Sequence, residues 1–245
     1  MARGGSLFLA IVISAAYRAG MSMTIAEDLL LLLLDDEKGT TPGMWVDVRV
    51  PLGAAVLAEL AIDGAVELEP RTSVWRGRTV RAADGAVDDD VLAAALRTVQ
   101  EKPRTATDLA GRLGDGLKDR LGQRLADQGM LERQDERVLG LFPRTRWPAL
   151  ASAHEAELRT RLAAVVVQGA APDERTAALV GILLALDRLG PTLGLKGAEA
   201  RDAKRRAKAL AEGDWAAKAV REAVQASISV VTTVMITATT VTTSS

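Results

Sequence analysis

The sequence predicts a mainly α-helical protein that folds as a single compact domain with one or two short β-hairpins. Hydrophobic residues make up 48% of the 245 residues and aromatic residues only 3%. Leu, Ala and Val must therefore form the core, and they suit packed helices better than a β-sandwich. Several segments also repeat apolar residues at helical spacing between capping and terminating residues. The length allows one substantial core or two small ones, and one domain is the simplest interpretation.

The first two predicted helices are strongly apolar. Thr24 and Glu27 fit a capping box, in which a hydroxyl and a carboxylate satisfy free N–H groups at a helix start, directly before the run Leu29–Leu34. Gly39 can take the left-handed conformation that ends helices. A second helix is predicted at Leu52–Ile62, where apolar residues again recur at helical spacing.

The middle of the chain predicts helices framed by hairpins. Short apolar runs that flank turn residues predict two hairpins: Ala65–Glu69 with Arg78–Ala82, and Met130–Glu132 with Arg137–Phe142. Three helices are predicted between them: Val91–Gln100, Ala106–Leu113 and Leu117–Gln128. Asp88 or Asp89 can cap the first of these helices and Thr105 the second, whereas Gly129 terminates the third.

The C-terminal half predicts four further helical segments. A second capping box, Ser152 to Glu155, opens the predicted helix Ala153–Gln168. Pro172 is placed in the first turn of an apolar helix, Asp173–Leu189, because that turn tolerates proline, and Gly190-Pro191 is expected to break it. The last two segments are predicted near Ala198–Ala211 and Trp215–Gln225.

The two ends of the chain differ from its middle. Residues 1–21 are interpreted as an N-terminal extension, residues 22–225 as the folded domain, and residues 226–245 as a C-terminal segment with a Thr/Ser-rich tail. The apolar run Leu7–Ala16 is shorter than the roughly 18 residues that a membrane-spanning helix needs. A secretory signal peptide remains the alternative for this run.

The composition argues against most catalytic chemistry. The 31 basic and 32 acidic residues nearly cancel, so no global field attracts a polyanion. The chain has no Cys and a single histidine, His154, which is predicted to lie in a first helical turn. Glycine-rich phosphate loops, nucleophile elbows and His-Glu-x-x-His patterns are missing. We therefore predict no enzyme, no cofactor and no metal, and interpret Asp88–Asp90 as helix-capping residues.

Several motifs occur along the chain in the same order and spacing as in a known protein family. The series comprises Met23–Gly39 (MTIAEDLLLLLLDDEKG), Trp45, Leu57–Ala61 with Gly64, Arg124-Leu125 with Gly129–Leu131, and the apolar helix Leu179–Leu189. In this order and spacing the sequence resembles the Golgi phosphoprotein 3 family over residues 22–225. The resemblance implies a mostly helical domain with β-hairpins that associates through a hairpin. It also implies binding of phosphatidylinositol 4-phosphate on a flat, basic membrane face.

The resemblance implies a headgroup site made of one tryptophan and basic residues from two places in the chain. Trp45 matches the tryptophan, Lys118 matches one basic position, and Arg120 lies two residues further on. Binding a phosphate requires such fixed cationic donors. Two other basic positions of the family fall on Gly53 and Asp115, and the Asp115 carboxylate would repel a phosphate. Cations in neighbouring turns that could substitute are Arg49, Arg112 and Arg124.

The predicted hairpin at Glu132–Phe142 is the segment that the resemblance implies for oligomerisation. Its apolar residues are Val138, Leu139, Leu141 and Phe142. They fit either an interface between copies or packing onto the body. Trp45 likewise fits a core aromatic as well as a membrane contact, and the cations after Leu117 fit a solvated helix face.

The leading hypothesis is a cytoplasmic, non-enzymatic, peripheral membrane protein that binds an anionic phospholipid headgroup and forms homo-oligomers. One alternative is a helical scaffold that binds only protein partners. Another is a winged-helix nucleic-acid binder with Leu117–Gln128 as its recognition helix. Residues Arg97 to Trp147 hold 11 basic and 8 acidic residues, a net of +3. Asp115, Asp119 and Asp127 lie on or beside this helix, and they would repel the phosphates whose contacts supply most nucleic-acid affinity. No nucleic-acid partner is therefore predicted.

Overall fold

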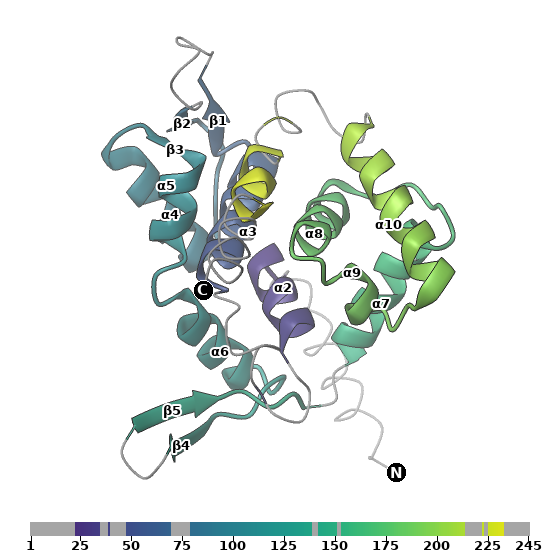
Figure 1. Cartoon of the computed structure of the whole chain (residues 1–245). Coiled ribbons are helices and arrows are strands. Elements are labelled where there is room, and N and C mark those ends of the chain that lie inside the picture. The colour runs from purple at the N-terminus through teal and green to yellow at the C-terminus, as the bar shows by residue number, and fades with distance from the viewer. Residues whose placement is uncertain are drawn as a thin grey trace, which may run out of the picture.

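The computed structural model describes residues 23–34, 39, 48–69, 79–138, 142–150, 153–213, 222 and 225–232, without the side chains of residues 137–138 and 142–144. Within these residues the fold is mainly helical with two small antiparallel sheets (Figure 1), which confirms the predicted fold class. No helix in this part of the chain combines the length and the apolar character needed to cross a bilayer.

Helix α2, Ile25–Leu33, is the buried centre of the fold. Its predicted capping box forms: the Glu27 N–H donates to the Thr24 hydroxyl at 3.2 Å, and the Thr24 N–H donates to the Glu27 carboxylate at 2.7 Å. Every residue of α2 is buried, because helices α3, Arg49–Ile62, and α8, Glu174–Ala185, pack against it. Helix α3 starts three residues before the predicted Leu52, since Pro51 fits its first turn.

Three helices and a small sheet cover one side of α3. The helices are α4 (Asp90–Glu101), α5 (Ala106–Leu113) and α6 (Leu117–Asp127), and the strands are β1 (Val66–Leu68), β2 (Thr79–Ala82) and β3 (Arg104–Thr105). The sheet is antiparallel in the order β1-β2-β3, so the predicted first hairpin gains a third strand. The predicted caps also form, because Asp89 accepts from the Val91 and Leu92 N–H groups and Thr105 accepts from the Asp108 N–H.

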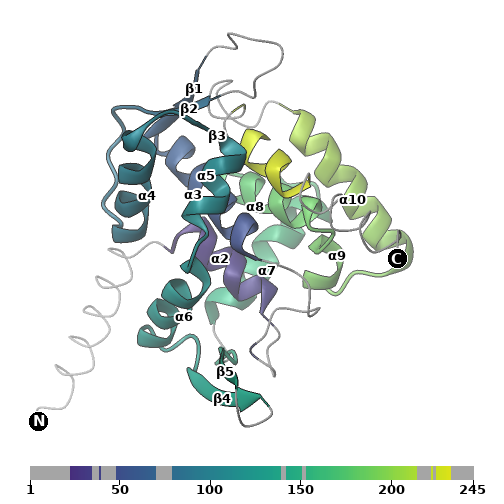
Figure 2. The same cartoon turned by 60° about the vertical axis from the view of Figure 1, so that its left-hand side comes forward.

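The second hairpin consists of β4, Gln134–Val138, and β5, Phe142–Arg146. Its register runs from the pair Gln134 and Arg146 to the pair Val138 and Phe142. The hairpin projects from the body beside α6 (Figures 1 and 2). Its strands lie further along the chain than predicted, because Leu131 instead forms an isolated bridge with Ala149 at the base of the hairpin.

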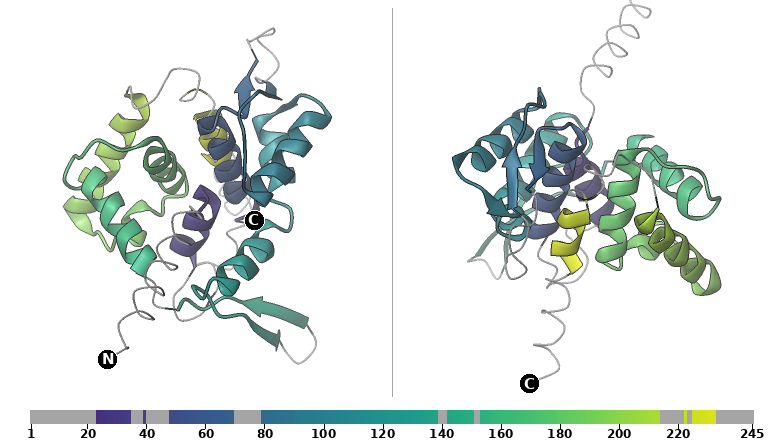
Figure 3. Two further views of the ribbon diagram at one scale, coloured as in Figure 1. Left: turned by 180° about the vertical axis from the view of Figure 1, so that it is seen from behind. Right: turned by 90° about the horizontal axis from the view of Figure 1, so that it is seen from above.

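The opposite side of α2 and α3 is covered by the C-terminal helices (Figures 1 and 3). These are α7 (Ala153–Val166), α8, α9 (Leu189–Thr192) and α10 (Gly197–Glu212). Residues 225–232 are also helical, with Val230 and Val231 in the core and Ile228 against Gly181 of α8. The helices α4–α6 and α7–α10 therefore lie on different sides of the molecule.

The start of α8 corrects the prediction for Pro172. Asp173 is the N-cap residue of this helix, and its carboxylate accepts from the Thr176 N–H at 2.7 Å. Pro172 therefore precedes the cap and does not lie in the first helical turn. A short polar side chain at the N-cap position satisfies a free N–H group, and that interaction decides where the helix begins.

The end of α8 also differs from the prediction. The helix stops at Ala185 rather than at Leu189. Asp187 follows with a φ of 54°, the left-handed conformation that terminates helices. Gly190-Pro191, which was expected only to break the helix, lies inside α9. Proline is tolerated there because the first N–H groups of a helix have no intrahelical acceptor.

His154 joins α7 to the buried helix α2. Its Nε2 lies 2.7 Å from Oδ1 of Asp28. This hydrogen bond raises the pKa of His154 above its ordinary value of 6.5, although partial burial opposes the shift. Because the folded-state pKa is the higher one, the stabilisation is complete below about pH 6.5 and is lost as the pH rises through the folded-state pKa.

Replacing His154 with Gln should therefore reduce stability in a pH-dependent way. We expect a loss of about 1 kcal/mol near pH 5.5, where the imidazolium faces the Asp28 carboxylate, and a smaller loss near pH 8.5. Urea unfolding of both proteins at the two pH values measures the difference. An equal loss at both pH values would contradict a contribution from the charged imidazole.

Candidate functional site

The predicted headgroup residues fall at the start of α6, except Trp45, which lies outside the described residues. Lys118 is half-buried and Arg120 is exposed. The two side chains are two residues apart, so they leave the helix about 200° apart around its axis. The structure therefore does not bring Lys118 and Arg120 together on one side of α6.

Arg120 faces the start of α4. Its guanidinium binds the Asp90 carboxylate, with Nη2 and Oδ2 2.7 Å apart. This hydrogen bond, reinforced by the charges of Arg120 and Arg124, lowers the pKa of Asp90 below its usual value. Both side chains are largely exposed, and exposed ion pairs contribute little stability. Arg120 can therefore exchange Asp90 for another anion at small cost.

The start of α3 meets the turn between α5 and α6. Nη1 of Arg49 lies 3.0 Å from Oδ1 of Asp115, although 66 residues separate them in the sequence. The backbones are also close, because a Cβ atom on Gly114 would lie 1.9 Å from the Arg49 carbonyl oxygen. The two chain regions that the resemblance assigned to the site thus converge. Asp115 has the Arg49 guanidinium as its ion-pair partner.

The N-terminus of helix α6, which carries the positive end of the helix dipole, lies next to the Arg49–Asp115 contact. Its N-cap is Gly116, which has a φ of 67° and provides no side-chain hydrogen bond to the first N–H groups. The N-terminus of a helix attracts anions through these N–H groups and the helix dipole. Arg49 and Lys118 add cationic charge near this end, whereas Asp115 opposes it.

A cavity of about 180 Å³ lies beside this turn, between α4 and the α5–α6 segment. Thr98, Arg112, Asp115 and Arg120 contribute the polar side chains of its lining. Arg112 binds Asp108 one helical turn away, with Nε and Oδ1 2.9 Å apart. Of the substitute cations considered from the sequence, Arg112 lines the cavity and Arg49 reaches Asp115.

Arg124, the third substitute cation, points into the fold. Its Nε lies 2.9 Å from the buried Glu27 carboxylate, and its other nitrogens bind Asp89 and Asp90. Burial raises the pKa of Glu27, while the Thr24 N–H and Arg124 oppose that shift. The capping box of α2 was predictable, but its link to α6 was not. The Arg124 guanidinium is therefore bound by three carboxylates of the protein and does not face a ligand.

The resemblance placed a basic position at Gly53, and the structure explains why no side chain fits there. Gly53 is buried in the contact between α3 and α5. A Cβ atom there would lie 1.9 Å from the Ala110 carbonyl oxygen, far inside contact distance. Position 53 therefore cannot contribute a side chain to any ligand site at the start of α3.

Trp147 is an aromatic residue that the sequence analysis did not single out. Its indole is 1% exposed and packs on Gly122 of α6, and the Arg133 guanidinium lies 5.9 Å from the ring centre. Trp147 therefore holds the base of the hairpin against α6. Among the described residues no group of three or more His, Asp or Glu side chains could hold a metal ion.

These features define a class of protein: a mainly helical domain with a projecting hairpin and a mixed-charge surface at the start of one helix. The family model described as Golgi phosphoprotein 3 matches residues 25–227, which is more than half of the chain. The protein belongs to the Golgi phosphoprotein 3 family. The side chains of Val138, Leu139, Leu141 and Phe142 lie outside the described residues, so oligomerisation through the hairpin stays a prediction.

Proposed function

We propose that this protein is a non-enzymatic, peripheral membrane protein of the cytoplasm. It binds an anionic lipid headgroup, by resemblance phosphatidylinositol 4-phosphate, where the start of α3 meets the α5–α6 turn. The observation that carries the proposal is the contact between Arg49 and Asp115 at 3.0 Å. That contact joins the two chain regions which the family resemblance assigns to the headgroup.

Each residue has a role in the proposed complex. Lys118 and the first N–H groups of α6 contact the phosphate, and Arg120 contributes from the neighbouring cavity after leaving Asp90. Trp45 lies at the bilayer interface, where tryptophan is favoured. Association through the β4–β5 hairpin would multiply a weak single contact by avidity.

Asp115 weakens this site in the proposed mechanism. The carboxylate competes with a phosphate for Arg49 and adds a like charge near the ligand. Replacing Asp115 with Asn should therefore strengthen binding to vesicles by about fivefold, because one unit of charge near a membrane surface contributes about 1 kcal/mol. Lys118→Glu should weaken binding by at least the same factor.

Co-sedimentation with phosphatidylcholine vesicles, with and without phosphatidylinositol 4-phosphate, measures these effects. Arg97→Glu is the charge-matched control for Lys118→Glu, because Arg97 is exposed on α4 and does not line the cavity. A third vesicle with phosphatidylserine separates headgroup recognition from general charge attraction. The proposal fails if wild-type protein sediments equally with all three vesicles.

A winged-helix nucleic-acid binder is the second candidate, favoured by the element order α4, β3, α5, α6 and hairpin. In the structure, however, β3 pairs with β2 and the β4–β5 hairpin forms a separate sheet. Two arginines of α6, Arg120 and Arg124, already bind the Asp90 carboxylate. Duplex DNA binding that weakens steeply with salt would favour this candidate over lipid binding.

A further inference from the structure

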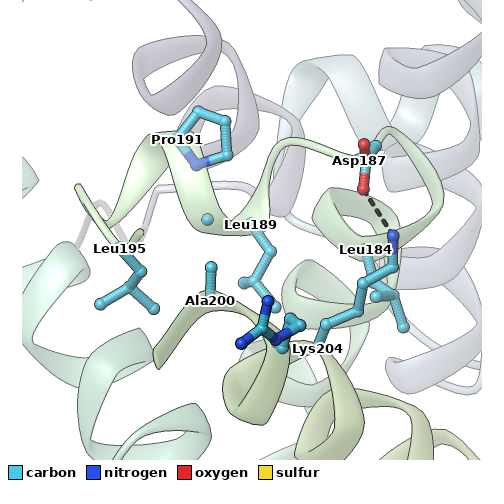
Figure 4. A pocket seen from close by; sticks show the side chains of 9 residues that line it. Leu184, Asp187, Leu189, Pro191, Leu195, Ala200 and Lys204 are labelled. Atoms are coloured by element: carbon cyan, nitrogen blue, oxygen red, sulfur yellow. Dashed lines mark hydrogen bonds and ion pairs between the residues drawn. The ribbon is translucent and has the colours of Figure 1, made fainter. Parts of the chain in front are cut away.

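A second cavity, of about 250 Å³, lies among the end of α8, α9 and α10, on the opposite side of the molecule from α6 (Figures 1 and 4). Its apolar lining consists of Leu184, Leu189, Pro191, Leu195 and Ala200. Apolar cavities of about 150 Å³ already accept a benzene-sized molecule. This cavity can therefore accept one apolar side chain of the size of leucine or phenylalanine.

Cations border this cavity along one side. Arg201 and Lys204 belong to its lining, and Lys204 binds Asp187 with Nζ and Oδ1 2.8 Å apart (Figure 4). Arg205 and Lys208 continue the series along α10. We call Arg201, Lys204, Arg205 and Lys208 the α10 basic stripe, because residues three and four apart share one helix face. All four side chains are exposed.

The α10 basic stripe keeps a positive charge after its own ion pairs are counted. Lys204 binds Asp187, and Arg205 binds Asp202 at 2.9 Å. Arg201 and Lys208 have no carboxylate partner among the described residues. Four cations against three carboxylates (Asp187, Asp202 and Glu212, which follows Lys208 by four residues on the same face) leave a local charge of +1 on a protein whose formal net charge is −1. The stripe therefore attracts a negatively charged partner.

The opposite face of α10 explains why the stripe faces outward. Ala203 and Ala207 are buried, and α10 packs through this small-residue face on α7, α8 and α9. Close packing of that face leaves the long basic side chains on the solvent side. The apolar cavity and the cationic stripe thus lie next to each other on one accessible surface.

The shape of the surface favours a peptide over a bilayer. A membrane-docking surface presents protruding apolar side chains, whereas the apolar residues here line a hollow that receives a protruding side chain. The stripe also lies on the other side of α2 and α3 from α6 (Figures 1 and 3). A flat membrane that contacts the α6 surface could not reach it, a point that rests on the proposed function.

We propose that the α10 basic stripe and the adjacent cavity bind an acidic peptide segment of a partner protein, with a leucine or phenylalanine side chain of that segment inserted into the cavity. An apolar side chain in a pocket supplies most of the affinity in such complexes. Complementary charge around it raises the association rate and selects the partner. The same fold would then offer a lipid surface at α6 and a protein surface at α10.

Fluorescence anisotropy with a synthetic probe tests this inference on the full chain. The probe is a fluorescein-labelled peptide of Asp and Glu residues that carries two leucines three positions apart, and the matched peptide has serine in place of both leucines. We expect the leucine peptide to bind at least about tenfold more tightly than the serine peptide. Arg201→Glu/Lys208→Glu should weaken binding of the leucine peptide by at least about tenfold.

Two further variants separate the cavity from the charge. Ala200→Leu fills the cavity and should weaken the leucine peptide without changing the serine peptide. Arg97→Glu/Lys102→Glu, a control double variant on the α4 side, should change binding by less than about twofold. Thermal melting of each variant establishes that it is folded.

Two results would overturn the inference. The first is equal binding of the leucine and serine peptides, since the cavity would then contribute nothing. The second is unchanged peptide binding by Arg201→Glu/Lys208→Glu. In that second case, a loss of vesicle sedimentation in the same double variant would assign the stripe to a membrane. Failure of the α6 lipid site leaves all peptide measurements interpretable.

Discussion

Replacing Gly53 with alanine should destabilise the protein by about 3 kcal/mol, because overpacking against backbone cannot be relieved by a change of rotamer. The added Cβ would lie 1.9 Å from the Ala110 carbonyl oxygen and 2.9 Å from the Gly114 nitrogen. Helices α3 and α5 would have to move apart, and they form a close contact that positions the α5–α6 turn. Urea unfolding monitored by circular dichroism measures the loss.

Gly111→Ala is the matched control on the facing helix. A Cβ atom at Gly111 has no atom within 4 Å, so the substitution removes backbone freedom from α5 without a clash. It should stabilise the protein by about 0.5 to 1 kcal/mol. If both variants changed stability by the same amount, the close approach of α3 and α5 at Gly53 would be disproved.

Replacing Arg175 with methionine should cost about 3 kcal/mol near pH 8.5, because it leaves a buried carboxylate without its cation. Arg175 donates one hydrogen bond to the Glu59 carboxylate and another to the Met23 carbonyl oxygen. Glu59 is 3% exposed, and its other oxygen accepts from the Ile25 N–H at 2.7 Å. This pair therefore connects α3, α8 and the start of α2.

The cost of Arg175→Met should be smaller near pH 5. Burial raises the pKa of Glu59 from 4.5 to about 7, although Arg175 opposes the shift. A raised carboxyl pKa stabilises the fold below about pH 4.5, and this contribution is lost as the pH rises through about 7. Without Arg175 the pKa of Glu59 should rise further, so stability should fall more steeply between about pH 5 and 8.5 than in the wild type.

Glu59→Gln supplies the control for this prediction. The double variant Arg175→Met/Glu59→Gln has no carboxylate to leave unpaired, so near pH 8.5 it should be more stable than Arg175→Met alone. Urea midpoints of the three variants at both pH values complete the comparison. A pH-independent loss in Arg175→Met would show that Glu59 does not carry the effect.

The sequence predicted the local elements well because their signals are local. Thr24, Asp89 and Thr105 each cap a helix as expected, since each bonds to an N–H group within three residues. The errors in α8 arose where two local signals competed. Asp173 is the N-cap residue, so the helix begins one residue later than the position of Pro172 had suggested. Asp187 adopts the left-handed conformation after the helix end, where glycine is the usual residue.

The candidate site was only partly predictable. The sequence identified Lys118 and Arg120 as candidates and Asp115 as an opposing charge, but it did not reveal their partners. Asp90 binds Arg120 across 30 residues, and Arg49 binds Asp115 across 66 residues. Pairings of exposed charges leave little signal in a single sequence, because each contributes only about 0 to 1 kcal/mol.

The amino-acid sequence by itself determined the helical class, the caps at Thr24, Asp89 and Thr105 and the presence of two hairpins, because these depend on interactions among residues close along the chain. Only the tertiary structure decided which way the two arginines of α6 point: Arg124 inward to Glu27 and Arg120 across to Asp90. It also decided that position 53 admits only glycine, since the Ala110 carbonyl oxygen occupies the space of a side chain. Helix packing brings these groups together, and packing depends on every element at once.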